Sequence, residues 1–154
     1  MNENAVVTIC IGEEYNRIAE YTHPTIKRYA DKITADFVVI NESNSTSPHW
    51  EKFQLFHLLN KYRRIIYLDT DLLVRQDCPN LFEIVPESQI GLFNEMPFTS
   101  NRYLSLVEAG KDYNIKLPDW NGKYYNTGVM VISRPVSYTH LRAHETSLHL
   151  VCRL

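Results

Sequence analysis

The stretch RIIYLDTDLLV, residues 64–74, decides the fold and points to a functional site. Its first part, Arg64–Leu68, is apolar after the arginine and predicts a buried β-strand. The next three residues are Asp69, Thr70 and Asp71. Because an unpaired carboxylate is costly to bury, either the strand ends at Leu68 and the aspartates lie in a polar cleft, or they meet a cation or hydrogen-bond donors. Both interpretations indicate a functional site.

The composition is that of an ordinary soluble globular domain. The chain has 154 residues, of which 44 % are hydrophobic and 22 % charged, enough for one domain with its own core. The formal net charge of -2 gives no field that would gather nucleic acid or an anionic membrane. No apolar run approaches the roughly 20 residues of a membrane span, and the N-terminus lacks the pattern of a secretory signal. We therefore expect no nucleic-acid partner, no transmembrane segment and a cytoplasmic location, where the scattered Cys10, Cys78 and Cys152 would be reduced thiols.

The last residues of the chain differ from the rest. The segment VSYTHLRAHETSLHLVCRL, residues 136–154, contains His140 and His144, whose spacing would place both rings on one face of a helix, as a metal site needs. However, VSYTHLRAHET and LVCRL resemble, in order and reading frame, the translation of a common sequencing-library adapter. We therefore expect residues 135–154 to be a non-native tail, to be left out of fold reasoning. The native part is then residues 1–134, an N-terminal fragment of a gene that continues beyond Arg134.

Strand and helix patterns alternate through the native part. Strands are expected at residues 5–11, 36–40, 64–68, 89–94 and 124–133, and helices at 16–29, 50–62 and 102–109, with a short helix within 78–86. Asn16 is expected to cap the first helix, and Pro24 to kink or divide it. The alternation predicts an α/β fold with a mainly parallel sheet and flanking helices.

Polar residues follow the expected strands where each strand ends. Tyr15, Glu42, Asp69, Asp71 and Glu95 all lie just after a strand. Parallel sheets bind ligands outside the carboxyl ends of their strands. The sequence therefore predicts that these side chains gather along one edge of the sheet.

The two aspartates admit two explanations. They could simply accept backbone N–H groups in a turn. Alternatively, Asp69 and Asp71 face the same way on an extended segment and repel each other unless a cation lies between them. Their hard oxygen ligands suit Mg²⁺ or Mn²⁺ with positions left for phosphate oxygens.

Four segments together resemble the nucleotide-sugar glycosyltransferases with the GT-A fold. They are VVTICIGEEYN (6–16), WEKFQLFHLLNKYRRIIYLDTDLLV (50–74), DCPNLFEI (77–84) and YYNTGVMVIS (124–133). The resemblance is greatest to glycosyltransferase family 8, the group of glycogenin and the lipopolysaccharide galactosyltransferases. It implies a Rossmann-like GT-A fold, here C-terminally truncated, with residues 1–134 as its nucleotide-sugar-binding part.

The resemblance also implies an activity. The parent protein would be a hexosyltransferase that uses Mn²⁺ or Mg²⁺ to transfer a sugar from a nucleotide diphosphate sugar, a UDP-hexose, with retention of configuration. The acceptor would be a glycan, a lipid or a protein. In relatives the third metal ligand is a histidine far downstream of the NTG strand, which this chain lacks, so this fragment itself is expected to be inactive.

Donor-binding roles follow from matching positions. Asp69 and Asp71 would bind the metal, with Asp71 the firmer ligand and Asp69 also near the ribose. Tyr15 would stack on the nucleotide base, although it could equally be a partly exposed turn tyrosine. Lys52 would lie near the donor phosphates, and its alternative is a solvated helix lysine.

Three further residues are assigned around the sugar. Glu95 matches a carboxylate near the donor sugar, and Asn126 matches an asparagine on the sugar and acceptor side. Gly128 would permit close approach of the backbone to the substrate. Lys52, Glu95 and Asn126 form the expected catalytic set.

Two other functions fit parts of the sequence. A haloacid-dehalogenase-type phosphatase also places DxD after an apolar strand, but Leu73 stands where such enzymes have Thr or Val, and Asp112 and Asp119 do not form the paired-acid motif it needs. A non-enzymatic sugar-nucleotide-binding protein would carry the same motifs. Metal-dependent hydrolysis of a sugar nucleotide by the full-length parent separates the three.

Truncation after Arg134 tests the non-native tail. A segment never selected to pack should contribute little, so the free energy of unfolding should fall by less than about 1 kcal/mol. Thermal melts of chains ending at Arg134 and Leu154 measure the difference. A large loss of stability, or a metal bound by His140 and His144, would contradict this expectation.

Overall fold

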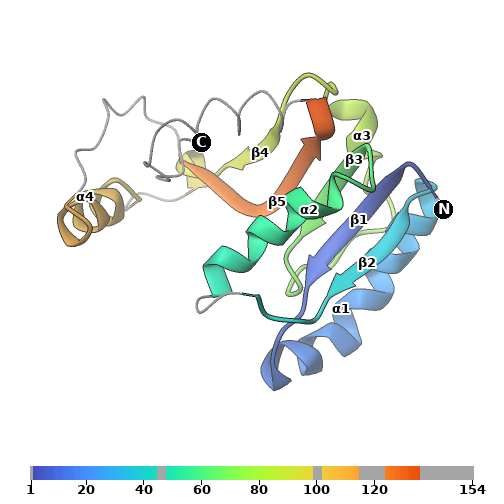
Figure 1. Ribbon diagram of the computed structural model, residues 1–154, viewed down its shortest axis with the longest axis horizontal. Helices are drawn as coiled ribbons and strands as arrows, with labels where there is room; N and C mark the ends of the chain where they lie inside the picture. The colour runs from blue at the N-terminus through green and yellow to red at the C-terminus, as the bar shows by residue number, and fades with distance from the viewer. Residues whose placement is uncertain (1, 45–47, 99–101, 115–123, 136–154) are drawn as a thin grey trace. The chain divides into compact units, whose positions relative to one another are not determined.

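Three parallel strands form one side of the sheet. The computed structural model describes residues 2–44, 48–98, 102–114 and 124–135. Strand β1 (Asn4–Ile9) pairs in parallel with β2 (Asp36–Ile40) on one side and β3 (Arg64–Leu68) on the other. Strand β5 (Tyr125–Ser133) runs antiparallel to β3, and the sheet order is β2-β1-β3-β5-β4, with β4 at Gly91–Asn94 (Figure 1). The predicted α/β fold with a mainly parallel sheet is confirmed.

The helices connect these strands. They are α1 (Glu13–Lys32), α2 (Gln54–Leu58), α3 (Leu81–Ile84) and α4 (Arg102–Asp112), with 3₁₀ helices η1 (Pro48–Phe53) and η2 (Met96–Phe98). In the described part of the chain, no helix is long and apolar enough to cross a membrane. The tail, with His140 and His144, lies outside the described residues.

The chain divides into two compact units. Residues 92–127 form the second, and the rest of the described chain belongs to the first. Within the second unit, the side-chain oxygen of Asn94 accepts hydrogen bonds from the backbone N–H groups of Met96 and Tyr124, both at 3.3 Å. The N–H of Glu95 donates to the Tyr124 carbonyl at 2.8 Å. These bonds hold the end of β4 beside the segment that leads into β5.

Helix α1 starts earlier than expected, and Asn16 does not cap it. Its N-cap is Gly12, whose φ of 98° is a conformation that glycine adopts without strain. The side chain of Asn16 instead accepts a hydrogen bond from the Cys10 thiol at 3.2 Å. Pro24 lies inside the helix and does not divide it.

The helix expected at residues 50–62 was wrong in form. Residues 48–53 are a 3₁₀ helix and only residues 54–58 are α-helical. The predicted amphipathic face was also wrong, because Trp50 and Phe53, which it placed inward, are 50 % and 37 % exposed, whereas Leu55 and Leu59 lie in the core with 0 % and 3 % exposure. Lys52 lies in the 3₁₀ helix, before the α-helical part begins.

One face of the sheet is closed by α1. Its buried cluster contains Val6, Ile66, Leu68 and Val131 of the strands and Ile26, Tyr29 and Ala30 of α1. Because side chains alternate along a strand, Ile65 and Tyr67 of β3 face the other way. Lys52 of η1 stands over the Tyr67 ring, and Figure 1 shows α1 and α2 on opposite sides of β1 and β3. Strand β3, whose residues are all buried, is therefore covered on both faces.

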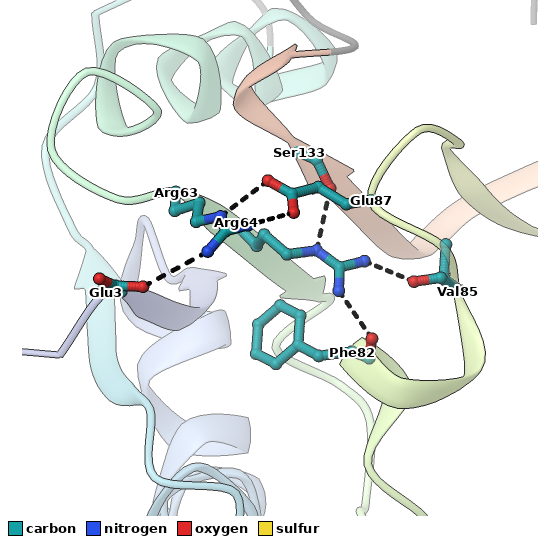
Figure 2. Close-up of polar contacts among 7 residues, drawn as sticks. All are labelled: Glu3, Arg63, Arg64, Phe82, Val85, Glu87 and Ser133. Carbon is teal, nitrogen blue, oxygen red and sulfur yellow. Dashed lines mark hydrogen bonds and ion pairs between the residues drawn. The ribbon is translucent and has the colours of Figure 1, made fainter.

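A buried guanidinium joins β3, β5 and α3. Arg64, 8 % exposed, donates to Ser133 Oγ at 2.9 Å and to the carbonyls of Phe82 and Val85 at 2.6 Å each (Figure 2). It also lies over the Phe82 ring. Burial lowers the pKa of Arg64, yet an arginine stays protonated in proteins. One side chain therefore links β5 to the segment of α3 through three hydrogen bonds.

Its neighbour Arg63 provides a matched comparison. Arg63 is exposed and pairs with Glu87 and Glu3, as Figure 2 shows. Arg64→Met should lower the free energy of unfolding by about 2–4 kcal/mol, because it removes a charged donor from one buried and two partly buried acceptors. Arg63→Met should cost less than about 1 kcal/mol, as for other exposed ion pairs. Urea unfolding of both variants measures the difference, and equal losses would contradict it.

Candidate functional site

Alternation along the backbone separates the residues of the DTD motif. Ile66 and Leu68 face α1, so Tyr67 and Asp69 face the side of η1. The Asp69 N–H donates to the Gly128 carbonyl at 2.8 Å, which continues the pairing of β3 with β5 beyond Leu68. The Leu72 N–H then donates to the Asp69 carbonyl at 3.2 Å. The strand therefore ends in a turn that begins at Asp69.

The Asp69 carboxylate has two side-chain partners. Its Oδ1 accepts a hydrogen bond from the Tyr67 hydroxyl at 2.5 Å and lies 3.0 Å from Lys52 Nζ. The same ammonium is 4.9 Å from the centre of the Tyr67 ring. The side chains of Lys52 and Asp69 are 26 % and 36 % exposed, so the pair borders solvent. Lys52 is not a solvated helix lysine, and Asp69 does not rely on turn N–H groups alone.

The environment of Tyr67 reports the charge around the site. Burial raises the pKa of the Tyr67 phenol, and so do the charge of Asp69 and its hydrogen bond. The charge of Asp71 acts in the same direction. Tyr67 therefore stays protonated and remains a donor to Asp69. Asp69 and Asp71 therefore act on the same phenol at the end of β3, and the predicted gathering of Tyr15, Glu42 and Glu95 with them stays a prediction.

Asp71 and Tyr15 are open to ligands. Asp71 is exposed, and Tyr15, in the first turn of α1, keeps 46 % of its surface in solvent. The Tyr15 ring is therefore accessible from solvent and need not move out of the core to contact another molecule. Both side chains can therefore meet a bound molecule.

Thr70 points away from the aspartates. It is 3 % exposed, and its hydroxyl accepts a hydrogen bond from Thr8 Oγ1 at 3.1 Å and lies 2.9 Å from His23 Nε2. The Thr70 carbonyl accepts from Thr22 Oγ1 at 2.6 Å. Burial lowers the pKa of His23, which favours the neutral ring at this bond. The middle residue of the motif is thus fixed to β1 and α1.

The remaining predicted residues lie on β5 and directly after β4. Gly128 is buried and binds Asp69 through its carbonyl. Glu95 and Asn126 belong to the second compact unit, where both side chains are partly buried. The structure therefore brings Lys52, Asp69 and Gly128 together, and the roles of Glu95 and Asn126 stay predictions.

Two residues of the site were missed from the sequence. Tyr67 could have been found, because it stands two residues before Asp69 on the same face of the strand. Glu51 is 2 % exposed, and its carboxylate accepts from Ser43 Oγ at 2.5 Å, the Asn44 N–H at 3.1 Å and Gln54 Nε2 at 2.6 Å. It fixes the loop after β2 to η1 beside Lys52, a contact that no local pattern indicates.

The two aspartates suit a divalent cation that a phosphate ligand helps to hold. Mg²⁺ is commonly bound through one or two carboxylates together with substrate phosphates. Among the described residues, no group of three or more His, Cys, Asp or Glu side chains is placed to hold a metal. One partly exposed and one exposed carboxylate therefore fit a shared cation better than a closed protein site.

Comparisons with known proteins identify the family. The model of glycosyl transferase family 8 matches residues 10–136. Among solved structures, the fold resembles that of a glycosyltransferase involved in the glycosylation of the major capsid of PBCV-1, with a TM-score of 0.57 and 16 % identity. That match covers 91 % of this chain and 64 % of the other, so the chain spans about two thirds of that protein's length. No curated protein sequence matches. Because the family match spans most of its length, the chain belongs to glycosyl transferase family 8.

Proposed function

We propose that this chain is the donor-binding part of a metal-dependent hexosyltransferase. Residues 1–134 would bind a UDP-hexose together with Mn²⁺ or Mg²⁺. The full-length protein would transfer the hexose to a glycan, lipid or protein acceptor with retention of configuration. The observation that carries the proposal is the pair Asp69 and Asp71 at the carboxyl end of β3, with Lys52 held against Asp69 at 3.0 Å.

Asp69 and Asp71 would hold the cation between the protein and the donor diphosphate. A bound divalent cation supplies neutralisation of the charge that grows on the leaving diphosphate. Tyr67 fixes the orientation of Asp69 by donating to its Oδ1, which leaves the other carboxylate oxygen for the ligand. Exposed Asp71 can turn both of its oxygens toward the cation.

Lys52 would supply a second positive charge to the leaving group. Its ammonium already lies at the edge of the site, held by Asp69 and the Tyr67 ring. A diphosphate beside Asp69 would offer this ammonium a more highly charged partner. A fixed cation aimed at developing negative charge stabilises the transition state more than the ground state. Lys52 is therefore proposed as a catalytic residue.

The other residues would orient the donor. The exposed ring of Tyr15 would stack on the uracil base. Gly128, which already binds the Asp69 backbone, would let the donor approach β5 closely. Asn126 and Glu95 would contact the hexose, with Asn126 also on the acceptor side.

Metal-dependent UDP binding tests the donor site. Calorimetry should show UDP binding in the presence of Mn²⁺ and much weaker binding after chelation. Asp71→Asn should weaken UDP binding with Mn²⁺ by at least about 10-fold, because it removes the charge from a metal ligand.

Asp77→Asn is the control, since Asp77 lies in the same loop and pairs with Arg75. It should bind UDP like the wild type. Equal affinity of the Asp71 variant and the wild type would exclude Asp71 as a ligand.

Lys52→Ala tests catalysis in the full-length protein. Loss of a charge that meets the leaving group should lower kcat about 100-fold and leave KM nearly unchanged. UDP-hexose hydrolysis measures both constants. Lys61→Ala is the matched control, because Lys61 also lies 4.9 Å from a tyrosine ring, that of Tyr62, on the exposed surface.

Unchanged kinetics in the Lys52 variant would remove its catalytic role. UDP binding by the full-length protein without any metal-dependent hydrolysis would instead favour the sugar-nucleotide-binding protein.

A further inference from the structure

The hydroxyl of Thr70 lies at the centre of a buried polar group beneath the two aspartates. Thr8, Thr22 and Thr70 are 0 %, 4 % and 3 % exposed. Thr8 Oγ1 donates to Thr70 Oγ1 at 3.1 Å, and Thr70 Oγ1 is 2.9 Å from His23 Nε2. The Thr70 hydroxyl can thus accept a hydrogen bond from Thr8 and donate one to the neutral His23 ring. Its donor and one of its acceptor positions are then both satisfied.

The backbone of Thr70 is held as firmly as its side chain. Its carbonyl accepts from Thr22 Oγ1 at 2.6 Å. The His23 ring is itself placed by an edge-to-face contact with Phe37 of β2, with the ring centres 5.6 Å apart. Strand β1 and helix α1 therefore both bind the one residue between Asp69 and Asp71, and β2 supports the His23 ring.

The same helix also fixes the loop that follows. Val74 N–H donates to Thr25 Oγ1 at 3.0 Å, and Lys32 Nζ donates to the carbonyls of Gln76 and Cys78 at 2.9 Å each. Tyr29 Oη donates to the Pro79 carbonyl at 3.0 Å and accepts from the Leu81 N–H at 3.1 Å. Residues 22, 25, 29 and 32 form one stripe on the surface of α1. The side chains of this stripe are hydrogen-bonded to the chain between Thr70 and Leu81.

We propose that Thr70, held by Thr8, Thr22 and His23, is a positioning residue that sets the directions of the Asp69 and Asp71 carboxylates toward the cation and the donor. This inference rests on the proposed function. Thr70 touches neither ligand and acts through its two neighbours. A turn without internal hydrogen bonds would lose backbone freedom when the ligand binds, which weakens binding. The buried bonds of Thr70 order it in advance.

Isosteric substitution separates positioning from packing. Thr70→Val keeps the shape of the side chain and removes its hydroxyl, whereas Thr70→Ser keeps the hydroxyl and removes a methyl group. Thr70→Val should weaken UDP binding in the presence of Mn²⁺ by about 10-fold or more, the range typical of residues that orient metal ligands. Thr70→Ser should stay within about threefold of the wild type, because small changes without a lost bond alter binding by less than 1 kcal/mol.

Thr25→Val is the control for general damage to the loop. Thr25 lies on the same stripe of α1 and holds Val74 of the same loop, but it does not contact the DTD motif. Its variant should lose stability much as Thr70→Val does and keep UDP affinity within about threefold. Calorimetry of the 154-residue chain gives the affinities, thermal melts show that each variant is folded, and the electron paramagnetic resonance signal of bound Mn²⁺ reports the geometry of its ligands.

The outcomes are distinguishable. Wild-type affinity in Thr70→Val, or equal weakening in Thr25→Val, would overturn the positioning role and leave the proposed function standing. A wild-type chain that binds no UDP with Mn²⁺ would remove the proposed function and this inference with it. If Thr70→Val does not fold, His23→Phe and His23→Gln repeat the comparison, since Gln can replace the Nε2 contact and Phe cannot. Weakening by Phe alone supports the role, and equal affinities overturn it.

Discussion

Side-chain alternation along β3 is the constraint on which the site depends. An extended backbone sends successive residues to opposite faces, so a strand buried on both sides must carry apolar residues throughout. Where β3 runs past Leu68, the same alternation divides a polar motif. Asp69 reaches the side of η1 and Lys52, and Thr70 reaches the side of α1. One short sequence thus places Asp69 beside Lys52 and Asp71 in solvent, while the Thr70 hydroxyl faces the protein interior.

The ion pair between Lys52 and Asp69 reduces the negative charge of the site before a ligand arrives. A carboxylate that faced Asp71 with no cation nearby would suffer repulsion. Lys52 Nζ at 3.0 Å relieves that repulsion, while the Tyr67 hydroxyl keeps the carboxylate from rotating. An incoming cation would take over part of the role of Lys52 and release its ammonium toward the phosphates. Donor binding would then be an exchange of ionic partners, which costs less than exposing new charges.

Much of the fold and part of the site followed from local sequence patterns. Strands β2 and β3 lie where apolar β-branched runs predicted them, and family resemblance indicated a role for Lys52 near the donor phosphates, although its pairing with Asp69 was not predicted. The prediction that Asn16 caps α1 was wrong, because the helix already begins after Gly12, whose positive φ suits glycine better than other residues. The links of Thr70 to Thr8 and His23 join residues 62 and 47 positions apart. Periodicity describes which face a residue occupies, and it does not say which distant hydroxyl will meet it there.

The stripe of α1 that follows residues 70–81 has an evolutionary consequence. This segment of chain has almost no regular structure, and such loops usually tolerate insertions and deletions. Here the helix fixes the distances between the residues that bind the loop, because an α-helix rises by about 1.5 Å per residue. The length of the loop between these contacts is therefore constrained. One residue added between Asp71 and Cys78 would shift the carbonyls that Lys32 binds out of register. We therefore expect this loop to vary in sequence among close homologues and to keep its length.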